Sequence, residues 1–209
     1  LTTIAYRING KTTYAMEGSI FIAGAGVQWL RDRMKFFKKA SDTEKLVKSL
    51  KDNNNIYLVP AFTGLGAPHW DANARGLLTG ITRDTSPKEI VRATIEAVAY
   101  QTYDLFEAMK HDGLRPKIVK VDGGMVMNNW FSQFLSDIVN VKVLRPKVQE
   151  TTAVGAAFMA GLQIGVYKSL KDISKIWNLD KKFSPKMNNK RRNQVLQGWA
   201  KAIKKTLTN

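Results

Sequence analysis

Segments with the pattern of β-strands alternate with helix-like segments along this chain of 209 residues. Two strands joined at Asn9-Gly10 come first, because this dipeptide favours a type I′ hairpin turn. Further strands are predicted at residues 19–23, 56–59, 118–121 and 141–144. Helices are predicted at 27–37, 41–50, 85–109, 151–161 and 188–207, with another after residue 124. This alternation predicts one α/β domain with a largely buried sheet, undivided by any repeat or low-complexity linker.

Two places in the chain share the order strand, glycine-rich turn, helix, at residues 22–28 and 121–128. Glycine lets backbone N–H groups approach a ligand without a Cβ in the way, and a helix N-terminus attracts phosphate. An amide side chain follows four residues after a glycine in each place, about one helical turn into the helix. The alternative is a plain tight turn that needs glycine for its dihedral angles. The candidate ligand-binding residues are Gly24, Gln28, Gly124 and Asn128.

Neither turn has the sequence of a P-loop or of the Gly-x-Gly-x-x-Gly dinucleotide fingerprint, so any phosphate site belongs to another architecture. Asp122 precedes a glycine pair and could orient a loop or a hydrated metal. The two histidines, His69 and His111, lack acidic neighbours at ligand spacing, and no metal site is expected. Glu96 and Asp104 lie within the long predicted helix, where packing roles are expected. We therefore name no catalytic residue within this chain.

The net charge of +16 raises the alternative of a nucleic-acid binder, because lysine and arginine neutralise phosphates. The lysines recur on helix faces without stacking aromatics between them, and no nucleic-acid motif accompanies them. A solvated basic surface with no nucleic-acid partner is the favoured interpretation. The chain has no cysteine, no apolar stretch of membrane-spanning length and no signal-peptide pattern. We expect a cytoplasmic protein without a membrane span.

The loop at residues 59–71, Val-Pro-Ala-Phe-Thr-Gly-Leu-Gly-Ala-Pro-His-Trp-Asp, and the segment at 76–96 resemble the FGGY carbohydrate kinases. Sugar kinases of this family usually carry Gly-Glu-Arg-Thr-Pro where this chain has residues 64–68, so the resemblance is to the glycerol kinases within the family. It extends over nearly the whole chain. The resemblance implies an actin-, hexokinase- and Hsp70-like (ribonuclease H-like) α/β fold, with two domains closing over a cleft.

By this resemblance, residues 1–209 form a C-terminal FGGY domain truncated at its N-terminal side, because Leu1 falls within a strand of a longer chain. Gly24, Gln28, Gly124 and Asn128 match positions that contact ATP. The full-length form would use Mg-ATP, with Mg²⁺ as cofactor, to phosphorylate glycerol to sn-glycerol 3-phosphate, and would be a homo-oligomer.

The resemblance also places glycerol mainly on the other domain, and the proton-accepting aspartate upstream of Leu1. The chain alone is therefore expected to be inactive. The alternative is a nucleotide-binding fragment, or a degenerate paralogue of a carbohydrate kinase, without turnover.

Overall fold

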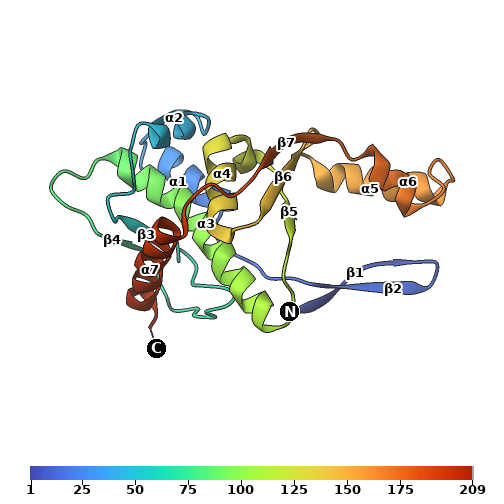
Figure 1. Cartoon of the computed structure of the whole chain (residues 1–209), viewed down its shortest axis with the longest axis horizontal. Helices are drawn as coiled ribbons and strands as arrows, with labels where there is room; N and C mark the ends of the chain where they lie inside the picture. The colour runs from blue at the N-terminus through green and yellow to red at the C-terminus, as the bar shows by residue number, and fades with distance from the viewer. Residues whose placement is uncertain (209) are drawn as a thin grey trace.

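The structure is a computed structural model that describes residues 1–208. A long central helix, α3 (Pro87–His111), runs through the molecule and carries most of the packing (Figure 1). It begins where the sequence predicts: the Ser86 side chain caps the helix, Glu89 completes the capping box, and proline occupies the first turn. Four helices pack against α3 or against its neighbours: α1 (Gly24–Asp32), α2 (Asp42–Lys48), α4 (Asn129–Val139) and α7 (Asn189–Thr206).

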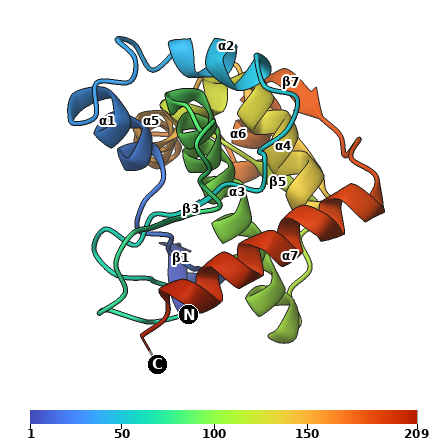
Figure 2. The same ribbon diagram turned by 90° about the vertical axis from the view of Figure 1, so that its left-hand side faces the viewer.

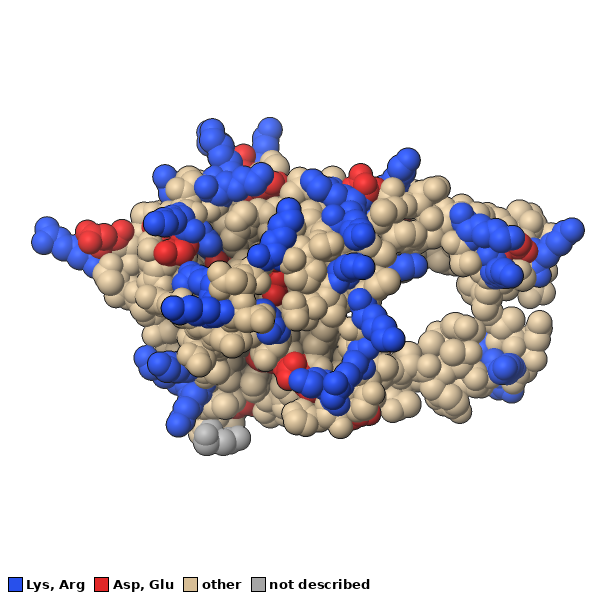
Figure 3. All heavy atoms as spheres, viewed as in Figure 1, with Lys and Arg blue, Asp and Glu red and all other residues tan. Residues whose placement is uncertain are grey.

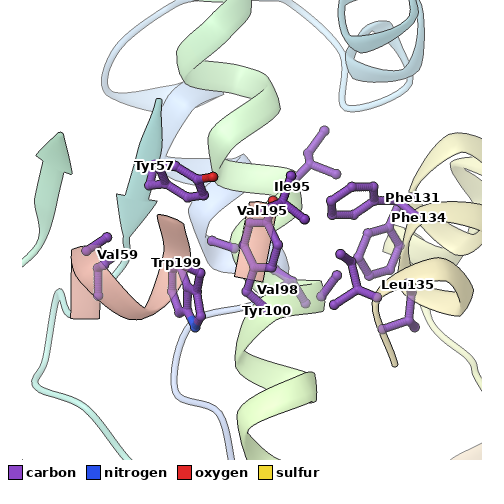
Figure 4. Packing of buried hydrophobic residues seen from close by; sticks show 14 of the residues in the cluster. Tyr57, Val59, Ile95, Val98, Tyr100, Phe131, Phe134, Leu135, Val195 and Trp199 are labelled. Atoms are coloured by element: carbon purple, nitrogen blue, oxygen red, sulfur yellow. The ribbon is translucent and has the colours of Figure 1, made fainter. Parts of the chain in front are cut away.

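Aromatic side chains from α4, from α7 and from the segment that contains Tyr57 meet around Tyr100 of α3 (Figure 4). Its ring stacks on Trp199 of α7 with centroids 5.3 Å apart, and meets Phe134 of α4 edge-on at 5.6 Å. The ring centroid of Tyr57 lies 5.9 Å from that of Tyr100. This cluster ties the C-terminal helix to the central helix, and Figure 2 shows α7 crossing in front of α3. None of the helices within residues 1–208 is long and apolar enough to cross a membrane.

The β-structure is divided among three small sheets. The hairpin of β1 (Thr2–Ile8) and β2 (Lys11–Met16) turns at Asn9-Gly10 with positive φ at both residues, which confirms the predicted type I′ turn. A second antiparallel pair joins β3 (Tyr57–Val59) to β4 (Leu77–Thr79). The third sheet joins three strands: β5 (Ile118–Lys120), the parallel β6 (Lys142–Pro146), and the antiparallel β7 (Leu179–Phe183).

The strands and helices of the structure differ from several of the predictions. The single, largely buried sheet is wrong, since only β3 is buried at every residue. The strand predicted at 19–23 is irregular backbone in the structure. The helix predicted at 27–37 ends at Asp32, and Lys35 beyond it has a φ of 59°, which a right-handed helix does not allow. The helix predicted at 41–50 is α2 at Asp42–Lys48, and the Ser41 side chain before it makes no capping hydrogen bond. Sequence reasoning also missed β4, β7 and helix α6 (Leu170–Ile176).

Two arms extend to the same side of the molecule (Figure 1). One is the β1–β2 hairpin, and the other consists of α6 together with α5 (Thr151–Gln163). Figure 3 shows an opening between them on this face, and shows lysine and arginine side chains spread over most of the molecule. Several large apolar side chains on the arms are exposed: Leu1, Ile4, Tyr6, Tyr14, Met159, Ile164 and Val166.

Candidate functional site

The four residues selected from the sequence line one hollow of about 250 Å³. Its walls come from α1, from the start of α2 and the residues before it, and from α3. The remaining wall is a short 3₁₀ helix, η1 (Gly124–Met127), followed by Asn128. Two glycine turns almost 100 residues apart in sequence are thus brought together by α3, which lies between them. The lining residues are Gly24, Val27, Gln28, Arg31, Ala40, Thr43, Ile95, Gly124, Met125 and Asn128.

The glycines in the two turns serve different purposes. Gly123 has φ near +83°, which favours glycine, and a Cβ on Gly26 would lie 3.0 Å from the Thr94 methyl group. At Gly24 and Gly124, an added Cβ would meet no atom of the described residues within 4 Å. Neither residue has a positive φ. At these two positions, therefore, neither backbone conformation nor packing within the chain requires glycine, and both open onto the hollow.

The hollow combines an apolar floor with a few polar groups. Val27 and Ile95 are buried in the core, and Met125 packs against it. Gln28 projects from an exposed position on α1. Such a combination is typical of small-ligand pockets, where apolar walls bury the ligand and a few polar groups orient it.

Asn128 differs in placement from the sequence prediction. It does not lie one turn inside a helix but is the N-cap of α4, where its Oδ1 accepts a hydrogen bond from the Phe131 backbone N–H at 3.0 Å. Its Nδ2 donates to Thr43 Oγ1 at 3.4 Å. The amide therefore has a structural role in addition to facing the hollow.

Two adjacent residues of α2 contact the start of α4. Besides the Thr43 contact, the Asn129 backbone N–H donates to Glu44 Oε2 at 3.3 Å, and Lys48 pairs with Glu44 Oε1 at 2.6 Å. Burial acts to raise the pKa of Glu44, but the hydrogen bonds from Lys48 and Asn129 outweigh it and lower the pKa. The carboxylate therefore stays charged and holds α2 against the second turn.

Arg145 of β6 also holds the same turn. Its guanidinium is almost fully buried and donates to the backbone carbonyls of Val126 at 2.7 Å and Met127 at 3.3 Å. It is also bonded to Asp180 of β7 at 2.7 Å. Sequence reasoning did not select Arg145, Thr43 or Glu44 for this site, since nothing local in the sequence relates them to a turn 16 to 85 residues away.

No carboxylate and no histidine is among the residues that line the hollow. Arg31 at its rim is paired with Asp32 at 2.7 Å. Asp122 accepts a hydrogen bond from Thr151, and within residues 1–208 no group of three or more acidic or histidine residues could hold a metal ion. The hollow is thus equipped to bind a ligand, and a reaction there would need groups from elsewhere.

The other acidic residues considered in the sequence have packing roles. Glu96 is buried and pairs with Arg92 at 2.8 Å, while Asp104 accepts from Trp199 Nε1 at 2.7 Å and contacts His69 at 3.2 Å. Both lie on α3, as predicted, and neither is among the residues that line the hollow.

Larger hollows exist, but their chemistry is less specific. One of about 400 Å³ lies between α7 and the β3–β4 pair, and a Cβ on its glycines, Gly80 and Gly198, would collide with Asn55 and Tyr57. Another of about 810 Å³ lies where the hairpin approaches the α5–α6 arm. In the first of these, the glycines are explained by internal packing, in contrast to Gly24 and Gly124.

The chain matches the model of the FGGY family of carbohydrate kinases, C-terminal domain, over residues 3–164. It is similar to glycerol kinase 1 of Pseudomonas aeruginosa, with 54% identity over 205 residues, 98% of this chain and 42% of the relative. Glycerol kinase of Gluconobacter oxydans is 52% identical over 209 residues, 100% of this chain and 41% of the relative. The chain therefore spans about two fifths of the length of these relatives.

Among solved structures, the crystal structure of Plasmodium falciparum glycerol kinase with ADP is similar, with a TM-score of 0.90 and 37% identity. The similarity covers 100% of this chain and 42% of that chain. The fold class predicted from the sequence is confirmed by this similarity.

Proposed function

This chain belongs to the FGGY family of carbohydrate kinases, and from that premise we propose that it is the nucleotide-binding part of an enzyme that phosphorylates glycerol. The proposed reaction transfers the γ-phosphoryl group of ATP to glycerol and yields sn-glycerol 3-phosphate and ADP. Glycerol is proposed as the acceptor because the relatives that match this chain over nearly its whole length are named glycerol kinases. We place glycerol mainly on the part of the protein that those relatives carry beyond the aligned region.

The observation that carries the proposal is the pair of open glycines, Gly24 and Gly124. Two glycines without a conformational or packing reason that both open onto one hollow leave room for a ligand to approach the backbone closely. Gln28 and Asn128 add amide groups on the same hollow, and the apolar surface of Val27 suits the face of a purine. We therefore propose these two glycines and two amides as the residues that bind ATP and ADP.

Mg²⁺ is proposed to enter with the nucleotide. Magnesium in phosphoryl-transfer sites is usually held by substrate phosphates, water and one or two carboxylates. Because the lining of this hollow contains no carboxylate, its residues do not fit a resident metal ion. The nucleotide phosphates would therefore be ligands of Mg²⁺ in place of side chains of the hollow. Phosphoryl transfer depends on positioning and charge stabilisation, to which this chain contributes the positioning of the nucleotide.

Further parts of the proposal concern the whole protein. We propose that residues 1–209 are one C-terminal FGGY domain, because the main hydrophobic cluster joins residues from Val27 to Ile203 and so extends past the matched region. A cytoplasmic location and a homo-oligomeric full-length enzyme complete the proposal. A second candidate function, nucleotide binding without turnover, is favoured by the absence of acidic and histidine residues from the hollow's lining.

A chimera separates the two candidates. The aligned 205 residues of P. aeruginosa glycerol kinase 1 are replaced by the matching residues of this chain, and glycerol-dependent ADP release is measured in a coupled assay. We expect activity from the chimera, and none from the 209-residue chain alone, which should still bind ADP in calorimetry. A folded chimera that binds ADP but turns over no glycerol would support the second candidate. A chain that does not bind ADP would contradict both.

A further inference from the structure

The contact between α2 and Asn128 joins residues 85 positions apart and lies at the edge of the hollow. Thr43 is 4% exposed, although its side chain carries a hydroxyl group. That hydroxyl has one hydrogen, which it donates to the Ala40 carbonyl at 2.6 Å. Its oxygen can therefore only accept a bond from Asn128, and the group that donates must be the amide nitrogen, Nδ2.

The opposite side of the same amide has an equally definite partner. The Phe131 backbone N–H can only donate, so the atom of Asn128 that faces it must be Oδ1. Thr43 and Phe131 thus require the same orientation of the amide, with Nδ2 toward α2 and Oδ1 toward α4. Rotating the amide by 180° would place donor against donor at Phe131 and lose both bonds.

Held in this way, the Asn128 amide has one N–H hydrogen and one oxygen lone pair still available, and Asn128 lines the hollow. A donor beside an acceptor matches the N6 amino group and N7 of adenine, whereas guanine presents two acceptors, O6 and N7, on the same edge. Without the Thr43 bond, only the Phe131 bond would oppose rotation of the amide, and a rotated amide would distinguish the two bases less well.

We propose that Thr43 is a positioning residue that locks the Asn128 amide in one orientation and thereby sets the preference of the hollow for adenine over guanine nucleotides. This inference rests on the proposed function, because it takes the hollow to be the nucleotide site. It adds a residue of α2 to the recognition of the base, at a position that sequence analysis assigned only to a helix start.

The test measures the dissociation constants of ADP and GDP by calorimetry, together with the melting temperature of each variant. Thr43→Val removes the hydroxyl with little change in volume and should weaken ADP binding about 5- to 10-fold, the range of one lost hydrogen bond. The ratio of the GDP to the ADP dissociation constant should fall by a similar factor. Thr43→Ser, which keeps the hydroxyl, should restore both values. If Thr43→Val does not fold, Thr43→Ala carries the same expectation.

Thr206 of α7 provides a matched control. It is 7% exposed and donates to the Ala202 carbonyl at 2.9 Å, as Thr43 does to Ala40, but it lies outside the hollow. Thr206→Val should lower the melting temperature by a similar amount and leave the ADP dissociation constant unchanged. A loss of ADP affinity in Thr206→Val equal to that in Thr43→Val would overturn the inference, since the effect would then follow from lost stability.

The double variant identifies the route of the effect. If Thr43 acts through Asn128, Thr43→Val combined with Asn128→Ala should bind ADP no more weakly than Asn128→Ala alone. Multiplicative losses, or an unchanged GDP-to-ADP ratio in Thr43→Val, would overturn the role of Thr43. Asn188→Ala is the control for Asn128→Ala, because Asn188 also caps a helix. Its Oδ1 accepts a hydrogen bond from the Arg191 backbone N–H of α7 at 2.8 Å. An Asn128→Ala variant that binds ADP normally would instead contradict the proposed nucleotide site, and this inference with it.

Discussion

At the scale of single residues, glycine occurs at different positions of this chain for different physical reasons. Gly123 supplies a positive φ and Gly26 leaves room for the Thr94 methyl group, whereas Gly24 and Gly124 need neither. Asn128 combines two roles, because the oxygen that caps α4 belongs to the amide that faces the hollow. Substitutions at such positions separate binding from folding only when each is compared with a residue of the same structural kind.

Gly124→Val tests whether the open face of the second turn is a binding surface. A Cβ added at this position meets no neighbour within 4 Å, so we expect a melting temperature within a few degrees of the parent. In the hollow it would occupy ligand space, and the ADP dissociation constant should rise at least about tenfold, roughly 1.4 kcal/mol. Calorimetry and thermal unfolding measure the two effects.

Gly155→Val is the matched control, because a Cβ on this glycine of α5 also meets no neighbour within 4 Å, and it does not line the hollow. It should bind ADP as the parent does. Normal ADP binding by a well-folded Gly124→Val variant would mean that the turn has only a structural role.

At the scale of the element, α3 carries a buried polar stack along one face. Arg92 pairs with Glu96 at 2.8 Å and donates to the Leu50 carbonyl at 2.8 Å, and the Tyr100 hydroxyl donates to Glu96 at 3.0 Å. Burial raises the pKa of Glu96, opposed by the charge of Arg92 and by hydrogen bonds from Arg92 and Tyr100. A buried pair of this kind adds little net stability, but removing one partner leaves an uncompensated charge.

Arg92→Met should therefore lower the free energy of unfolding by about 3–5 kcal/mol at pH 7. Without Arg92, burial raises the folded-state pKa of Glu96 further above its unfolded value of about 4.3. Stability linked to such a raised pKa is complete below the unfolded pKa and is lost as pH rises through the folded pKa. The deficit of Arg92→Met relative to the parent should consequently be smaller at pH 5 than at pH 7.

Denaturant unfolding at both pH values measures this deficit. Arg92→Met combined with Glu96→Gln carries no charge at either of these two positions, and its deficit should vary little between pH 5 and pH 7. An equal deficit for the single Arg92→Met variant at both pH values would show that loss of Arg92 does not raise the folded-state pKa of Glu96 any further.

At the scale of the whole molecule, the packed body around α3 contrasts with the two arms (Figure 1). Within residues 1–208 the β1–β2 hairpin pairs with no third strand, and it exposes Ile4, Tyr6 and Tyr14. Strand β5 likewise has β6 as its only partner among the described strands. Open strand edges with exposed apolar side chains favour association with further chains.

We expect the 209-residue chain to self-associate, with an average mass that rises with concentration above the 23.5 kDa of the monomer in sedimentation. Ile4→Lys, at a 62% exposed position of β1, should weaken this association by placing a charge on the edge. Ile81→Lys is the control, since Ile81 is 60% exposed but lies after β4, outside the hairpin. A parent chain that stays monomeric, or equal effects of both variants, would contradict a role for the hairpin.

Local signals in the sequence predicted several elements correctly. The hairpin at Asn9-Gly10, the capped start of α3 at Ser86 and the C-terminal helix α7 depend on neighbours within a few residues. Short-range hydrogen bonds and steric limits act identically in any fold. The four candidate ligand-binding residues were also selected from local patterns, because the identity of a glycine or an amide beside a turn is visible in the sequence.

Contacts between distant parts of the chain were decided only by the tertiary structure. Whether residues 19–23 pair as a strand depends on a partner strand, and none is found among the described residues. That Gly24 and Gly124 line one hollow, and that Thr43 and Arg145 hold the second turn, depends on how α1, α2 and β6 are placed around α3 and α4. The sequence by itself determined which residues had the chemistry to bind a ligand; packing of the core decided which of them meet, because that choice depends on contacts up to about 100 residues apart.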